Sequence, residues 1–84
     1  MTKATLKLYA SLSDFLPRGA EDNRIEIDLD EGDSVAEVID RFRLPLESCH
    51  LVLVDGVFIY PEDRADRLLE HGEVLAIWPP VAGG

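Results

Sequence analysis

The chain has 84 residues, 46% of them hydrophobic, and its 17 acidic and 8 basic side chains give a formal net charge of −9. This length predicts one domain with a modest core and argues against a deep, enclosed active site. The negative charge repels phosphate backbones and anionic membrane surfaces. We therefore expect no nucleic-acid and no membrane partner, and instead a protein partner with a basic surface.

Two features that the sequence lacks narrow the class further. No apolar run of about 20 residues could cross a bilayer, and the opening MTKATLKLYA alternates polar and apolar types instead of forming a secretion signal, so we expect a cytoplasmic protein. The single cysteine, Cys49, excludes an internal disulfide and thiolate-based zinc or iron–sulfur sites. We expect it to be a small buried apolar residue, and His50 beside it would face the other way in a strand, which makes a poor catalytic pair.

Alternating polar and apolar residues predict two strands in the first third of the chain. Residues 5–10, TLKLYA, place Leu6 and Leu8 on one face, and residues 24–30, RIEIDLD, separate aliphatic from acidic side chains in the same way. The polar segment between them, residues 11–23, is interrupted by proline and glycine and predicts a loop with one helical turn at residues 13–16.

The densest acidic stretch, EIDLDEGD, offers Asp28, Asp30 and Asp33 as oxygen ligands for a metal ion. Its glycine and its twelfth position do not match the calcium-binding loop of an EF-hand. We interpret the stretch as a solvated strand face that leads into a loop, and we expect no metal site.

The segment GDSVAEVIDRF changes the period from two to 3.6 and predicts the main helix. Ser34 followed by Glu37 forms a capping-box pattern. The apolar residues at spacings i, i+3, i+4 and i+7 form one stripe facing a sheet, and they are Val35, Val38, Ile39 and Phe42. Pro45 marks the end of the helix.

The second half of the chain predicts three more strands. LVLVDGVFIY consists of two apolar runs joined at Asp55-Gly56, a pair that suits a tight hairpin. The charged segment that follows is irregular and anchored by Leu68 and Leu69, and EVLAIW forms the last strand. In that strand Leu75 and Ile77 share one face, and Trp78 belongs to the other.

This element order predicts an α+β protein with a ubiquitin-like β-grasp fold, a mixed sheet of four to five strands with one main helix packed on one face. The β-grasp domain covers residues 1–78, and residues 79–84 form a flexible tail that ends in Gly83-Gly84. Glycine lacks a Cβ atom and allows close backbone approach to another protein. The preceding Pro79-Pro80 step favours an extended segment that projects the tail away from the sheet.

The hairpin LVLVDG, the segment LLEHGEVLAIWPPV and the terminal AGG together resemble the MoaD/ThiS family of sulfur-carrier proteins. The ending PPVAGG is most similar to the small subunits of molybdopterin synthases. The resemblance implies a carrier and not an enzyme. In such carriers an E1-like adenylyltransferase of the MoeB/ThiF type uses ATP to activate the carboxylate of the last glycine, here Gly84, which then becomes a thiocarboxylate that donates sulfur.

The same resemblance implies further partners and no bound cofactor. A cysteine desulfurase or a rhodanese would supply the sulfur, and the large subunit of molybdopterin synthase or another sulfur-accepting enzyme would receive it. Trp78 lies at the start of the tail, and aromatic residues are enriched at interface hot spots. We therefore expect a docking segment that consists of Trp78, Pro79, Pro80, Val81 and Ala82.

Residues 51–54 are apolar on both strand faces, which suggests that a partner covers the second face of the sheet. Tyr9 and Phe58 are expected to be ordinary packing residues. Three alternatives stay open: a sulfur carrier for thiazole or another metabolite, a ubiquitin-like modifier that passes Gly84 to a lysine, and a non-covalent β-grasp docking module.

Overall fold

The computed structural model describes residues 2–80, and it contains five strands and one α-helix in that range. In chain order they are β1 (Lys3–Leu8), β2 (Arg24–Asp28), α1 (Val35–Arg41), β3 (Leu51–Val54), β4 (Val57–Phe58) and β5 (Val74–Trp78). Short 3-10 turns are η1 (Ala10–Phe15), η2 (Leu46–Ser48) and η3 (Pro61–Asp63). The predicted helical turn at residues 13–16 therefore begins three residues earlier, directly after β1.

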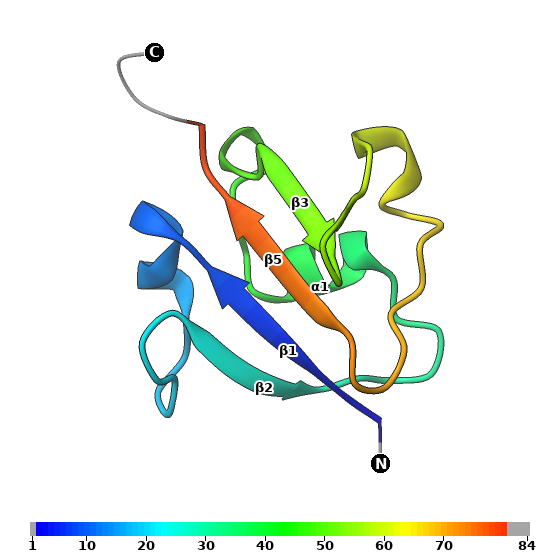
Figure 1. The fold of residues 1–84 in the computed structure, drawn as a ribbon, viewed down its shortest axis with the longest axis horizontal. Coiled ribbons are helices and arrows are strands. Elements are labelled where there is room, and N and C mark those ends of the chain that lie inside the picture. Colours follow the sequence, from blue (N-terminus) through cyan, green and yellow to red (C-terminus); the bar gives the residue numbers. More distant parts are fainter. Residues whose placement is uncertain (1, 81–84) are drawn as a thin grey trace.

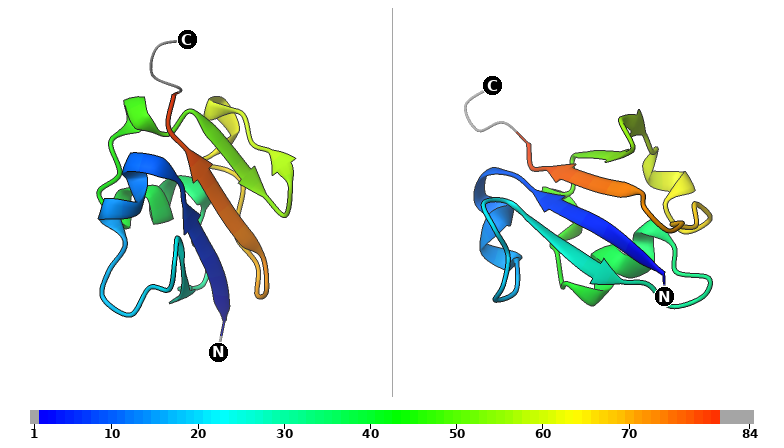
Figure 2. Two further views of the ribbon diagram at one scale, coloured as in Figure 1. Left: turned by 60° about the vertical axis from the view of Figure 1, so that its left-hand side comes forward. Right: turned by 60° about the horizontal axis from the view of Figure 1, so that its bottom comes forward.

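The five strands form one mixed sheet in the order β2-β1-β5-β3-β4. The first and last strands, β1 and β5, lie side by side at its centre and run parallel, while every other neighbouring pair is antiparallel (Figure 1). Helix α1 covers one face of this sheet (Figure 2). The arrangement confirms the predicted mixed sheet with one main helix.

The core lies between α1 and the helix-facing side of β1, β3 and β5. The side chains with no exposed surface in these elements are Leu6, Leu8, Val35, Val38, Val52, Leu75 and Ile77. The predicted stripe of α1 is confirmed, with Ile39 also buried and Phe42 packed against the edge of the core. Seven helical residues could not hold together alone, so α1 depends on this packing.

Both predicted local signals at the ends of elements are confirmed. At the start of α1, Ser34 Oγ accepts from the Glu37 amide at 3.1 Å, and Glu37 Oε1 accepts from the Ser34 amide at 3.2 Å. Between β3 and β4, Asp55 and Gly56 have φ angles of 49° and 83°. Two successive residues with positive φ are what a two-residue hairpin turn of type I′ requires.

One prediction about packing is wrong. Leu68 does not anchor its segment, because its side chain is 50% exposed and only Leu69, at 6%, is buried. Phe58 packs edge-on against the Tyr60 ring, with centroids 4.9 Å apart, but it pairs with Leu53 on the sheet face away from α1 and stays 37% exposed. A two-residue edge strand has too few neighbours to cover an aromatic ring, which explains the exposure of Phe58.

Within residues 2–80, no helix is long and apolar enough to span a membrane. The division into a domain of residues 1–78 and a tail of residues 79–84 remains a prediction, although β5 does end at Trp78. Val81, Ala82, Gly83 and Gly84 lie outside the described residues.

Candidate functional site

The candidate site is the end of the central strand β5, where the chain leaves the sheet. The last described residues are Trp78 and Pro79, both half-buried, and the exposed Pro80. Along β5, Leu75 and Ile77 face the core, which confirms that Trp78 belongs to the opposite face. We call this side, away from α1, the outer face of the sheet.

Three contacts hold the end of β5 in place. The Tyr9 amide donates to the Ile77 carbonyl at 3.1 Å, and the His50 amide donates to the Trp78 carbonyl at 3.1 Å. The rings of Tyr9 and Trp78 stack with centroids 4.0 Å apart and an interplanar angle of 7°. The end of β5 is thus fixed on one side by the residue after β1 and on the other by the residue before β3.

The start of β5 is fixed by an ion pair. Arg67 Nη2 lies 2.6 Å from Glu73 Oε2, and the Glu70 amide donates to Glu73 Oε1 at 2.7 Å. The hydrogen bond from Arg67 lowers the pKa of Glu73 and outweighs the effect of its burial, which raises it. The central strand that leads to the tail is therefore held at both ends.

An apolar surface adjoins the tail on the outer face. The strand register places Trp78 opposite Leu51 and Ala76 opposite Leu53, which in turn pairs with Phe58. We name this set, Leu51, Leu53, Phe58, Ala76 and Trp78, the outer apolar surface. Leu51 is 36% exposed and Phe58 is 37% exposed, so much of its apolar area is in contact with water. This is the arrangement that the apolar pattern of residues 51–54 predicts.

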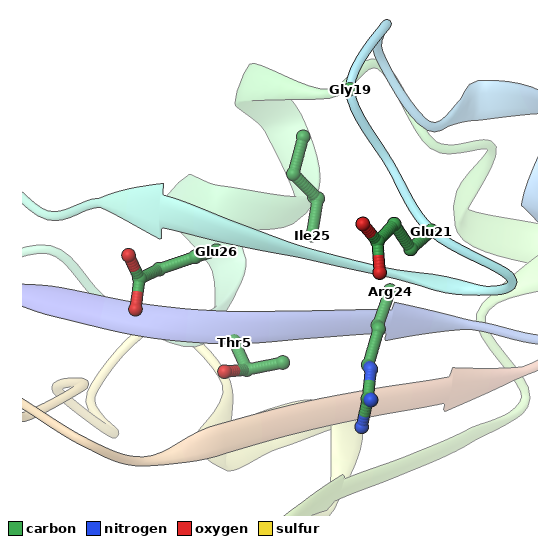
Figure 3. Close-up of a pocket in the computed structure, with 6 residues that line it drawn as sticks. All are labelled: Thr5, Gly19, Glu21, Arg24, Ile25 and Glu26. Atoms are coloured by element: carbon green, nitrogen blue, oxygen red, sulfur yellow. The ribbon is translucent and has the colours of Figure 1, made fainter.

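The other half of the outer face is charged. Lys7 pairs with Arg24, and Lys3 pairs with Asp28, whose side chains lie 2.7 Å apart. The hydrogen bond between them raises the pKa of Lys3 and lowers that of Asp28. In a shallow hollow of about 270 Å³ here, the Arg24 side chain extends across β1 towards β5, while Ile25 points the other way (Figure 3). These solvated groups form no nucleophile–base pair.

Cys49 is a buried residue, as predicted, with 3% of its surface exposed. Burial raises the pKa of its thiol, although the positive charge of Arg64 opposes this effect. A thiol kept protonated is a poor nucleophile. Among the described residues, no three His, Cys, Asp or Glu side chains lie close enough together to hold a metal ion.

The acidic stretch is only partly the solvated strand face that its sequence indicates. Asp33 is 3% exposed, and its Oδ2 accepts from the Asp30 amide at 2.7 Å and from Arg41 Nη2 at 2.7 Å. Burial raises the pKa of Asp33, but the two hydrogen bonds and the charge of Arg41 outweigh it and hold this pKa below its usual value. The carboxylate fastens the loop to α1, a structural role that local sequence does not reveal.

The structure brings together Trp78, Pro79 and Pro80 from the predicted docking segment. It adds Tyr9, which the sequence predicts to be an ordinary packing residue. Strand alternation already placed Tyr9 on the face opposite Leu6 and Leu8, but its partner was hidden by the 69 positions that separate it from Trp78.

Comparisons with known proteins place the chain among ubiquitin-like proteins. The model of the family described as Mut7-C ubiquitin matches residues 1–82. No curated protein matches the chain. SAMP1 from Haloferax volcanii is similar in structure with a TM-score of 0.70 and 22% identity, over 98% of this chain and 99% of that one. A Pyrococcus furiosus protein described as molybdopterin converting factor, subunit 1, has the same TM-score and identity over 96% and 100%.

The two solved structures confirm the β-grasp fold that the sequence predicts. At 22% identity, the two solved structures speak for the fold alone. The family model, in contrast, covers nearly the whole sequence, and the chain therefore belongs to the Mut7-C ubiquitin family.

Proposed function

We propose that this protein is a sulfur carrier of molybdopterin synthesis, in which the carboxylate of Gly84 becomes a thiocarboxylate. One observation carries the proposal. The central strand β5 leads directly from the core to Pro79-Pro80, beside the partly exposed outer apolar surface. A partner that docks on this surface also meets Pro79 and Pro80, the last described residues before Gly84 in the sequence.

The proposed chemistry needs no catalytic side chain in the carrier. A carboxylate is a poor electrophile, so an adenylating enzyme must first let it attack the α-phosphorus of ATP, which releases pyrophosphate. The terminal sulfur of a persulfide then attacks the carbonyl carbon of the acyl adenylate, and AMP leaves. A thiol cleaves the resulting acyl disulfide, forms a disulfide with the donor cysteine and leaves the thiocarboxylate on Gly84.

In this account the partners are an E1-like adenylyltransferase, a persulfide donor and a sulfur-accepting synthase. The molybdopterin pathway is favoured because one structural relative is described as molybdopterin converting factor, subunit 1. ATP belongs to the activating enzyme, and the carrier itself binds no cofactor. The outer apolar surface provides the docking contact, with Trp78 as its aromatic residue nearest the tail.

The test changes the last residue and leaves the domain intact. Deleting Gly84, or adding one alanine after it, should abolish ATP–pyrophosphate exchange by the cognate adenylating enzyme. The melting temperature should stay nearly unchanged, because a terminal residue buries little apolar surface. Gly83→Val should reduce the exchange rate less, because the terminal carboxylate is retained. The active-site channel of the adenylating enzyme must then accept one additional side chain.

The proposal fails if the variant extended by alanine is adenylated and sulfurated as fast as the parent. In that case the chain is a non-covalent docking module. Recovery of the parent joined to lysines of other proteins, with no terminal sulfur, would instead assign it as a protein modifier.

A further inference from the structure

The chain turns away from the sheet directly after Tyr9, next to the start of the tail. Tyr9 has extended backbone angles, with φ of −108° and ψ of 155°, and Ala10 then takes a φ of 52°. A positive φ is costly for an alanine and is kept only where the surroundings impose it. The turn therefore places Tyr9 at this position at the expense of local backbone strain.

Interactions within η1 and with the core keep this turn in place. Leu12 is 1% exposed and its amide donates to the Tyr9 carbonyl at 3.1 Å, so the buried leucine ties the turn to Tyr9. Ser13 Oγ donates to the Ala10 carbonyl at 2.8 Å and supports the strained residue. Tyr9 is thus held at the start of η1, which the buried Leu12 and these hydrogen bonds fix to the core.

From this geometry we infer that Tyr9 is a positioning residue, which holds the Trp78 ring by stacking and thereby fixes the direction in which the tail leaves the sheet. The inference rests on the proposed function, because positioning matters only if a partner takes up the tail. The neighbouring backbone contacts fix the strand but not the ring, since the Tyr9 amide donates to the Ile77 carbonyl and the His50 amide donates to the Trp78 carbonyl.

Fixing the start of the tail lowers the cost of binding. A segment that already points in the required direction loses less conformational freedom when it enters a channel. A stacked aromatic pair contributes enough free energy to change an affinity by about 2- to 12-fold. Loss of the Tyr9 ring should therefore raise the KM of the adenylating enzyme for the carrier by about 2- to 12-fold. The kcat at saturation should not change, because the carboxylate that reacts is unaltered.

The first measurement is tryptophan fluorescence of the free protein. It reports on Trp78 alone, because Trp78 is the only tryptophan in the sequence. Tyr9→Ala should shift the tryptophan emission to longer wavelength and lower its anisotropy. Tyr9→Phe, which keeps the ring and removes only the hydroxyl group, should retain the parent values. If Tyr9→Ala leaves both emission and anisotropy at the parent values, the ring does not hold Trp78 and the inference is wrong.

The second measurement is a double-mutant cycle on the KM in pyrophosphate exchange. Tyr9→Ala should raise the KM in the parent but have no further effect in a Trp78→Ala background, because Tyr9 acts through Trp78. Tyr9→Phe, which keeps the aromatic ring, should have the same KM as the parent. Phe15→Ala is the matched control, since it removes an aromatic ring that is 39% exposed at the other end of η1 and should leave the KM unchanged.

The outcomes separate the two claims. If the parent itself is not adenylated, the proposed function fails, and the fluorescence result still decides whether Tyr9 holds Trp78. If the parent is adenylated but Tyr9→Ala has the parent KM, positioning by Tyr9 is refuted. If the effects of Tyr9→Ala and Trp78→Ala multiply in the double variant, Tyr9 contacts the enzyme directly and the inference is equally overturned.

Discussion

At the scale of single residues, Asp33 and Asp30 offer a matched pair of aspartates that face the same arginine. Asp33 Oδ2 lies 2.7 Å from Arg41 Nη2 and its side chain is 4% exposed, whereas Asp30 Oδ2 lies at 3.6 Å and its side chain is 89% exposed. Asp33→Asn removes the negative charge that accepts from Arg41 and should lower the free energy of unfolding. The loss should be only about 1 to 2 kcal/mol, because the Arg41 side chain keeps partial access to water. Asp30→Asn should change it little. Urea denaturation of both variants checks this, and equal effects would contradict it.

The same pair gives a pH dependence with a definite sign. The pKa of Asp33 is lowered in the folded protein, so the unfolded chain binds more protons as the pH falls. The stability from Asp33 is fully present above the ordinary aspartate pKa, about 3.9, and is lost as the pH falls through the lowered value. In melts below pH 4, Asp33→Asn should therefore flatten the acid-induced loss of stability seen in the parent.

At the scale of elements, the capping box of α1 can be tested at its first residue. Ser34→Ala removes the acceptor for the Glu37 amide and should cost about 1 kcal/mol. Thermal melts followed by circular dichroism measure the difference. A Ser34→Ala variant as stable as the parent would mean that the cap contributes nothing to a helix fixed by packing alone.

Packing of α1 on the sheet should contribute more than its cap. Ile39 is 1% exposed, and Ile39→Ala should lower the free energy of unfolding by about 2 to 5 kcal/mol because it leaves a cavity under the helix. A domain of this size has only about 4 to 12 kcal/mol in total, so part of the population could unfold. Asp40→Ala, on the exposed side of the same helix, is the control. Equal melting temperatures for the Ile39→Ala and Asp40→Ala variants would contradict the observed core.

The elements that could be predicted from sequence are those whose signals are local. The capping pattern, the apolar stripe of α1 and the Asp55-Gly56 turn each depend on residues within a few positions of one another. The features that were missed depend on distant contacts. The exposure of Leu68 and Phe58 follows from how few neighbours the fold gives them, and the burial of Asp33 follows from Arg41 crossing to the loop.

The candidate site shows the same limit. Alternation in the last strand predicted that Trp78 faces away from the core, but no periodicity could pair it with Tyr9, which directly follows the parallel strand β1. The relation of β1 to β5 is set by the topology of the whole sheet. Docking by residues 78–82 and activation of Gly84 stay predictions, since residues 81–84 lie outside the described part of the chain.

At the scale of the whole molecule, the net charge of −9 should steer association with a basic partner surface. The association rate with the adenylating enzyme should fall as salt is added, because ions screen long-range attraction. If Trp78 docks on the enzyme as proposed, Trp78→Ala should mainly speed dissociation. Stopped-flow binding over a salt series measures both rates. Salt-independent association would rule out steering, and an unaltered dissociation rate would remove Trp78 from the interface.

The central claim is that the carboxylate of Gly84 carries sulfur, and intact-mass analysis of the protein purified from its own host tests it most directly. The account predicts a population that ends at Gly84 and is heavier by the difference between one sulfur and one oxygen atom. Hydroxylamine should displace the sulfur as hydrogen sulfide and leave a hydroxamate on Gly84, whereas an alkylating reagent should trap the sulfur as a thioester at the last residue. A protein whose mass corresponds only to the unmodified carboxylate, under conditions in which the host makes the sulfurated product, would contradict the account.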